Sequence, residues 1–271
     1  HLIKKLQTDG VPKSLKNTVF PFEYNDFETL KKIVEKNKIG TIKMEVYRNI
    51  EPKNDFLKKV RKLADKKNIV LIFDECTSGF RKSYGGLHKI YGVKPDMAIF
   101  GKALGNGYAI TAVLGKREIM ESVQNTFSSS TFWTERIGSV AALETLKIMK
   151  DIKSWKLIDN IGANIKKTWK EISKNTNVPI EISGLNSLAQ FKIISRDSNV
   201  FKTFITQEML KENILASDTI YVSIKHNKKI LEKYYENLEK IFKIISKYQY
   251  SNNAKFLLET RESSMGLPRL N

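Results

Sequence analysis

The sequence has 271 residues, 41% of them hydrophobic, and a formal net charge of +18 that arises from 47 Lys and Arg residues against 29 Asp and Glu residues. This length and apolar fraction exclude a disordered or collagen-like chain and allow one large domain or two ordinary ones. The lack of a run of about 20 apolar residues and of a leader pattern predicts a cytoplasmic protein without membrane contact. Because the lysines are interleaved with Glu and Asp through expected helices, they favour solvated helix faces over a nucleic-acid partner.

The first half of the chain alternates short apolar runs with helical patterns. Runs rich in β-branched residues predict buried strands at 39–46, 69–73, 97–100 and 109–114. Between the first two runs, residues 56–67 carry apolar side chains at helical spacing, and Asn54 or Asp55 can cap this helix. Strands that alternate with helices predict a parallel or mostly parallel sheet.

The second half has a different character. Apolar stripes over residues 137–149 and 157–172 predict two long helices that leave the sheet. Further strands are expected at 180–183, 188–194 and 220–224, and further helices near 200–212 and 228–247. This pattern predicts a second, smaller α+β unit.

An acidic pair ends the second expected strand. Asp74 and Glu75 follow the apolar run 69–73 and precede a turn that contains Gly79. In open α/β sheets, ligands bind at the carboxyl ends of the strands, so Asp74 stands where a cofactor would bind. The other interpretation, that Asp74 caps the following turn, fits this segment equally well.

A lysine follows the next expected strand. Lys102 lies within Gly101–Gly107, which contains three glycines, and neither a Walker A nor a dinucleotide pattern is present. We expect this lysine to be poorly solvated, which lowers the pKa of an amine and makes it a nucleophile towards an aldehyde. Chemistry on pyridoxal 5′-phosphate needs such a lysine together with a carboxylate that keeps the pyridine nitrogen protonated. Taken alone, Lys102 is more commonly interpreted as an exposed surface lysine.

Two successive stretches of the sequence read FDECTSGFRKSYGGLHKIYGVKPDMAIFGKALGNGYAITAVLG and SSSTFWTERIGSVAALETLKIM. Together they resemble class III aminotransferases, and within them the glutamate-1-semialdehyde 2,1-aminomutase-like branch. The resemblance implies an α/β protein of pyridoxal-phosphate fold type I, with a mostly parallel sheet in an incomplete large domain and a smaller C-terminal α+β domain. We accordingly divide the chain into three ranges: 1–150, the C-terminal part of the large cofactor-binding domain; 151–250, the small domain; and 251–271, a tail.

Individual residues take roles from this resemblance. It implies that Lys102 forms the Schiff base with pyridoxal 5′-phosphate and that Asp74 partners the pyridine nitrogen. Cys76 stands where the family usually has a valine that packs against the cofactor ring, and an inert buried cysteine is compatible with the same position. Thr131 matches the threonine that reaches the cofactor phosphate of the neighbouring subunit, which implies a homodimer. It also belongs to a Ser/Thr-rich turn before a helix expected to start near Thr134.

The implied activity is the transfer of an amino group, either between a small-molecule donor and acceptor or within one molecule, with an amino acid, a semialdehyde or a keto-sugar as the substrate. One cysteine and three histidines leave no metal-ligand cluster. Because the family's phosphate-cradling loop is not found before residue 39, we expect a C-terminal portion of a longer protein that by itself binds cofactor weakly or not at all and is prone to aggregate. The alternative is a non-catalytic remnant that lacks the phosphate-binding region.

Overall fold

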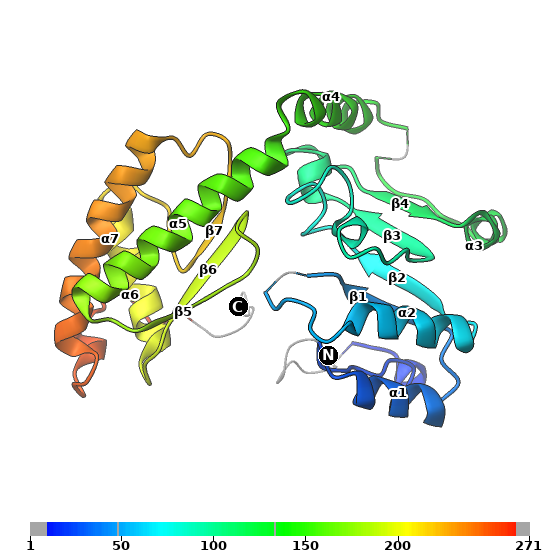
Figure 1. The fold of residues 1–271 in the computed structure, drawn as a ribbon, viewed down its shortest axis with the longest axis horizontal. Coiled ribbons are helices and arrows are strands. Elements are labelled where there is room, and N and C mark those ends of the chain that lie inside the picture. Colours follow the sequence, from blue (N-terminus) through cyan, green and yellow to red (C-terminus); the bar gives the residue numbers. More distant parts are fainter. Residues whose placement is uncertain (1–9, 48, 133, 264–271) are drawn as a thin grey trace.

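The computed structural model describes residues 10–47, 49–132 and 134–263. This part of the chain forms a four-stranded sheet and a three-stranded sheet, each packed against its own helices. Figure 1 shows the two units side by side, with one long helix leading from the first unit to the second. In the described part of the chain, no helix has the length and the apolar run required to cross a bilayer.

The four-stranded sheet contains, in spatial order, β1 (Thr41–Glu45), β2 (Val70–Asp74), β3 (Met97–Phe100) and β4 (Ala112–Gly115). The first three strands are parallel, and β4 is antiparallel to β3. This arrangement confirms the predicted mostly parallel sheet. Asp74 pairs with Glu45 on one side and with Ile99 on the other, so the carboxyl ends of β1, β2 and β3 meet at one end of the sheet.

Helices α1 (Phe27–Lys36) and α2 (Phe56–Lys66) supply the core of this unit. The apolar stripe expected on α2 is buried, as are alternate residues of β1 and β2, such as Ile42 and Leu71. The residues between them, such as Lys43 and Ile72, are exposed or half-buried. Within the described residues, therefore, only one face of the sheet is fully covered.

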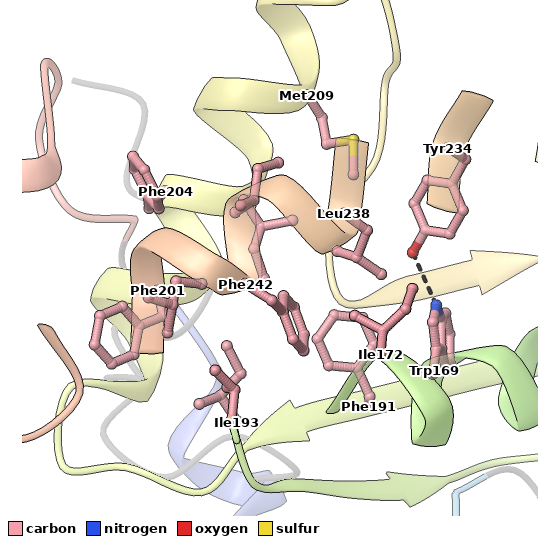
Figure 2. Close-up of a cluster of buried hydrophobic side chains, with 14 of the residues drawn as sticks. Trp169, Ile172, Phe191, Ile193, Phe201, Phe204, Met209, Tyr234, Leu238 and Phe242 are labelled. Carbon is pink, nitrogen blue, oxygen red and sulfur yellow. Dashed lines mark hydrogen bonds between the residues drawn. The ribbon is translucent and has the colours of Figure 1, made fainter. Parts of the chain in front are cut away.

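The three-stranded sheet is antiparallel and contains β5 (Ile180–Ser183), β6 (Leu188–Ile193) and β7 (Thr219–Tyr221). Its helices are α5 (Ser154–Thr176), α6 (Ser198–Lys211) and α7 (Lys228–Tyr248). Figure 2 shows its aromatic and aliphatic core, in which the buried indole N–H of Trp169 donates a 3.0 Å hydrogen bond to the hydroxyl of Tyr234. This unit is the smaller α+β domain that the sequence predicts.

The turn between β5 and β6 joins the two units. The backbone N–H of Gly184 donates to the carbonyl of Asn49, and the carbonyl of Gly184 accepts from the hydroxyl of Tyr47 at 3.2 Å and from Lys166 at 2.5 Å. Gly184 has a φ of +76°, which a residue without a side chain adopts readily. Leu185, the next residue, is buried in the core of the first unit. The limits drawn at residues 150 and 250 stay a prediction.

Two further α-helices lie between the two sheets in the sequence. A four-residue helix, α3 (Arg117–Met120), follows β4, and α4 (Ile137–Ile152) precedes α5. In α4 only Gly138 and Ala142 are buried. The expected apolar stripe of α4 thus lies largely on the surface.

Candidate active site at the ends of strands β2 and β3

Asp74 ends strand β2, and both of its carboxylate oxygens are engaged. Oδ2 lies 3.0 Å from Nζ of Lys43 on the neighbouring strand, and Oδ1 accepts a 3.1 Å hydrogen bond from the backbone N–H of Cys76. Burial raises the pKa of Asp74, but the hydrogen bonds from Lys43 and Cys76 outweigh burial and hold this pKa below its usual value. Asp74 therefore caps the following turn, as one of the two interpretations expects, and is ionised at neutral pH.

Lys102 follows strand β3 and folds back towards the loop after β2. Its Nζ donates a 2.8 Å hydrogen bond to the hydroxyl oxygen of Thr77. Its backbone has a φ of +47°, a left-handed conformation that is unusual for a residue other than glycine, asparagine or aspartate and that recurs at functional sites. The expectation that Lys102 is poorly solvated is wrong for this structure, because its side chain is exposed. The physical reason is that no described segment packs over the Lys102 side chain, whose Nζ contacts only Thr77 among the described residues.

Cys76 contacts both Asp74 and the segment that carries Lys102. A Cβ atom placed on Gly101 would lie 3.3 Å from Sγ of Cys76 and 3.3 Å from the methyl group of Thr111. Glycine at position 101 therefore lets the segment that carries Lys102 lie directly against Cys76. Burial and the charge of Asp74 raise the pKa of the Cys76 thiol, which stays protonated at neutral pH and presents a small, weakly polar surface.

Glu75 points away from this group and fixes the loop that carries Thr77. Its buried carboxylate accepts hydrogen bonds from the hydroxyl of Ser78 at 2.6 Å and from the backbone N–H of His88 at 2.9 Å, and it lies 2.9 Å from Nδ1 of His88. Burial raises the pKa of Glu75, but these hydrogen bonds lower it more. The loop is thus anchored by a buried anion.

Thr131 is not brought to the same place. It lies in an exposed turn, and within the described residues it makes no hydrogen bond to Asp74, Cys76 or Lys102. The helix expected to start near Thr134 begins three residues later, at Ile137. The structure therefore brings together three of the four residues that the sequence singles out.

Two further residues of the site, Lys43 and Thr77, are not identified by the sequence analysis. Lys43 is a polar residue between the buried Ile42 and Met44, and this alternation is the only local signal that it faces the open side of the sheet. Thr77 carries no comparable signal, because its contact with Lys102 depends on the conformation of two loops. No group of three or more His, Cys, Asp or Glu side chains suited to a metal ion occurs in the described ranges.

Comparison with known proteins gives consistent matches. The family model for class-III aminotransferases matches residues 48–245. A 3-aminobutyryl-CoA aminotransferase from Cloacimonas acidaminovorans is 34% identical over 76% of this chain and 52% of its own length. A glutamate-1-semialdehyde 2,1-aminomutase from Methanococcus maripaludis is 32% identical over 83% of this chain and 58% of its own. The chain thus spans between half and three fifths of the length of these curated relatives.

Solved structures show the same fold. The FumI protein of Sphingopyxis sp. MTA144, determined in its PLP internal aldimine form, superposes with a TM-score of 0.82 at 21% identity over 93% of this chain and 64% of its own. An omega-transaminase from Sphaerobacter thermophilus superposes with a TM-score of 0.77 at 21% identity over 87% of this chain and 59% of its own. These likenesses confirm the predicted fold class.

Proposed function

Because the chain belongs to the class-III aminotransferase family, we propose that it carries the catalytic lysine and the ring-binding carboxylate of an enzyme that transfers an amino group with pyridoxal 5′-phosphate. Lys102 is the proposed lysine and Asp74 the proposed carboxylate. The observation that supports this most directly is that both lie at the carboxyl ends of adjacent parallel strands, and that Cys76 and Thr77, in the loop after Asp74, bond to Asp74 and Lys102 respectively.

The residues at this end of the sheet fit the cofactor. A protonated pyridine nitrogen needs an anionic partner, and the pKa of Asp74 is held low enough for its side chain to be ionised. Lys43, which now pairs with Asp74, has a side chain that is 56% exposed, so it can turn to solvent when another cation takes its place. When bound, pyridoxal 5′-phosphate supplies an aldehyde and an electron-accepting ring.

Each residue then has a distinct role. Asp74 would hold the protonated ring nitrogen through its negative charge, and Lys102 would hold the aldehyde end of the cofactor and carry a proton to or from the substrate. The hydroxyl of Thr77 would orient Nζ, and Cys76 would lie beside the ring. An amine must be neutral to act as a nucleophile, so we expect these roles to require that further groups cover the exposed Lys102.

Substrates and partners follow from the same proposal. The donor and acceptor are small molecules. This chain is similar both to a relative named an aminotransferase and to one named an aminomutase. We propose a homodimer in which Thr131 of one subunit reaches the cofactor phosphate of the other. The exposed apolar side chains of Phe127, Val140 and Leu143, which lie near Thr131 in the sequence, support an apolar subunit contact.

A second candidate is a non-catalytic relative that keeps the fold. The exposure of Lys102 favours it, because within the described residues nothing shields the side chain from solvent. The two candidates differ in whether the chain converts an amino donor.

The test is a single-turnover transfer. The purified chain is loaded with pyridoxal 5′-phosphate and mixed with an amino acid donor, and the keto acid is measured against cofactor alone. The proposal expects keto acid in proportion to bound cofactor from the wild type and from Lys94→Ala, an exposed lysine outside the site. It expects none above background from Lys102→Ala. Cofactor binding without keto acid from the wild type would favour the non-catalytic candidate.

A further inference from the structure

Arg81 lies between the loop of the candidate site and the small domain. Its Nε donates a 2.8 Å hydrogen bond to the backbone carbonyl of Thr77. Its guanidinium carbon lies 5.2 Å from the centre of the Tyr221 ring on β7, a cation–π contact. Thr77 thus accepts a hydrogen bond from Lys102 through its hydroxyl and one from Arg81 through its carbonyl.

Arg81 has no carboxylate partner within the described residues, unlike the other partly buried arginine. Arg61 pairs with Asp65 at 2.7 Å and with Asp96 at 2.8 Å. The two terminal nitrogens of Arg81 make no hydrogen bond to the part of the chain that the structure describes. Burial lowers the pKa of Arg81, and the nearby Tyr221 opposes this effect. No Arg81 atom is among the buried, unpartnered polar atoms of the described residues, so its terminal N–H groups reach solvent and can meet an anion.

We infer that Arg81 binds an oxoanion group of a small molecule that occupies the Lys102 site, with Tyr221 supporting the guanidinium from the small domain. This inference rests on the proposed function. A guanidinium presents two parallel N–H groups that match the paired oxygens of a carboxylate or a phosphate. Because Lys102 and Arg81 both bond to Thr77, the inferred position of the oxoanion group is on the Arg81 side of a molecule held at Nζ of Lys102.

The oxoanion has two candidate sources, the carboxylate of the amino donor or acceptor and the phosphate of the cofactor. The cofactor-free chain is titrated with glutarate, with its neutral diamide glutaramide and with inorganic phosphate, while the arginine Nε–Hε signals are followed by NMR. The Arg81 signal, assigned by its loss in Arg81→Gln, is expected to shift with an oxoanion and to stay in place with glutaramide. Tighter binding of glutarate assigns the group to the substrate, and tighter binding of phosphate assigns it to the cofactor.

Matched variants make this test specific. We expect oxoanion affinity to fall about tenfold or more in Arg81→Gln. Arg81→Lys should recover only part of it, because an ammonium group keeps the charge and lacks the paired N–H groups. Arg117→Gln, which removes the same charge from an exposed pair with Glu121, should bind as the wild type does. Equal affinity in the wild type and Arg81→Gln, or an equal response to glutaramide, would overturn the inference.

Two more variants separate the possible failures. Tyr221→Leu leaves the bond between Arg81 and Thr77 in place and should weaken oxoanion binding, so it carries the test if Arg81→Gln does not fold. An unchanged affinity in Tyr221→Leu would contradict the supporting role of the ring. Lys102→Ala should still bind the oxoanion, because Lys102 makes no contact with Arg81 in this scheme. Oxoanion binding without amino transfer would therefore count against the proposed function and leave the role of Arg81 standing.

Discussion

The ammonium group of Lys102 and the hydroxyl of Thr77 are joined by a 2.8 Å hydrogen bond, although 25 residues separate them in the sequence. The bond links the loop after β2 to the loop after β3. It also helps to hold Lys102 in a left-handed backbone conformation, which costs on the order of 1 kcal/mol in a residue with a side chain. We therefore regard Thr77 as a positioning residue for Lys102.

Replacing Thr77 tests this role. Thr77→Val keeps the shape of the side chain and removes the acceptor, so Nζ of Lys102 loses its partner. We expect the rate at which Lys102 reacts with an aldehyde to change several-fold, while the free energy of unfolding falls by about 1 kcal/mol, because Thr77 is buried and loses one hydrogen bond. Thr77→Ser should restore the wild-type rate. Equal rates in the valine and serine variants would show that the hydrogen bond does not position the lysine.

The ion pair between Lys43 and Asp74 makes a second prediction. In Lys43→Met the carboxylate of Asp74 loses the main group that lowers its pKa, so this pKa should rise above the wild-type value. The carboxyl ¹³C resonance of Asp74, followed against pH, measures the change. Lys31→Met, which removes a lysine that lies 4.0 Å from Glu35 on the surface of α1, should leave the Asp74 titration in place. An unchanged midpoint in Lys43→Met would contradict the pairing.

A buried carboxylate at the opposite end of the sheet makes stability depend on pH. Asp96 lies 2.8 Å from Arg61 and 2.7 Å from Lys116, and it accepts a 2.7 Å hydrogen bond from the backbone N–H of Leu71. Burial raises the pKa of Asp96, but these contacts lower it from 3.8 to about 2. Because the folded-state pKa is depressed, Asp96 contributes stability above the unfolded-state pKa and loses it as the pH falls from about 4 to 2. The contribution is about 2 kcal/mol.

Urea unfolding between pH 2 and pH 6 measures this dependence. Asp96→Asn removes the charge and leaves Arg61 without its buried partner, so we expect a loss of about 2 to 4 kcal/mol at pH 6. The difference between wild type and variant should shrink as the pH approaches 2. A difference that stays constant over this range would exclude Asp96 as the source.

The exposed apolar stripe of α4 makes a prediction about association. Val140 is 62% exposed and Leu143 is 69% exposed, and apolar patches of this kind mark contact surfaces. The double variant Val140→Lys, Leu143→Lys should reduce self-association, measured by sedimentation, without loss of helix content, because lysine is a good helix former. Glu144→Lys makes the same change of +2 in charge at an exposed polar position of this helix and should associate as the wild type does. Equal association of the double variant and Glu144→Lys would show that the added charge, and not the loss of apolar surface, reduces self-association.

Strands and long helices are predictable from this sequence because their patterns are local. Residues 180–183 are an example, since the expected strand and β5 coincide. The five apolar residues of α2 are likewise buried as their spacing predicts. Helix α1 is absent from the sequence-based expectations, although Phe27, Leu30 and Val34 recur at helical spacing and Asp26 caps the helix.

The site was harder to predict than the fold. Asp74 and Lys102 each follow an apolar run, so their position at strand ends can be read from the chain. The partners Lys43 and Thr77 depend on strand register and loop conformation, which no local pattern specifies. The solvation of Lys102 depends on which segments cover its side chain. The local pattern predicted a poorly solvated lysine, whereas the structure shows an exposed one.

The role proposed for Lys102 is tested most directly by identifying the lysine that reacts with the cofactor. The chain is incubated with pyridoxal 5′-phosphate, reduced with borohydride and digested, and the labelled peptide is identified by mass spectrometry. We expect the label at low cofactor concentration to lie on Lys102 and Asp74→Asn to weaken this labelling. Label distributed over surface lysines, with Lys102 no more reactive than Lys94, would contradict it.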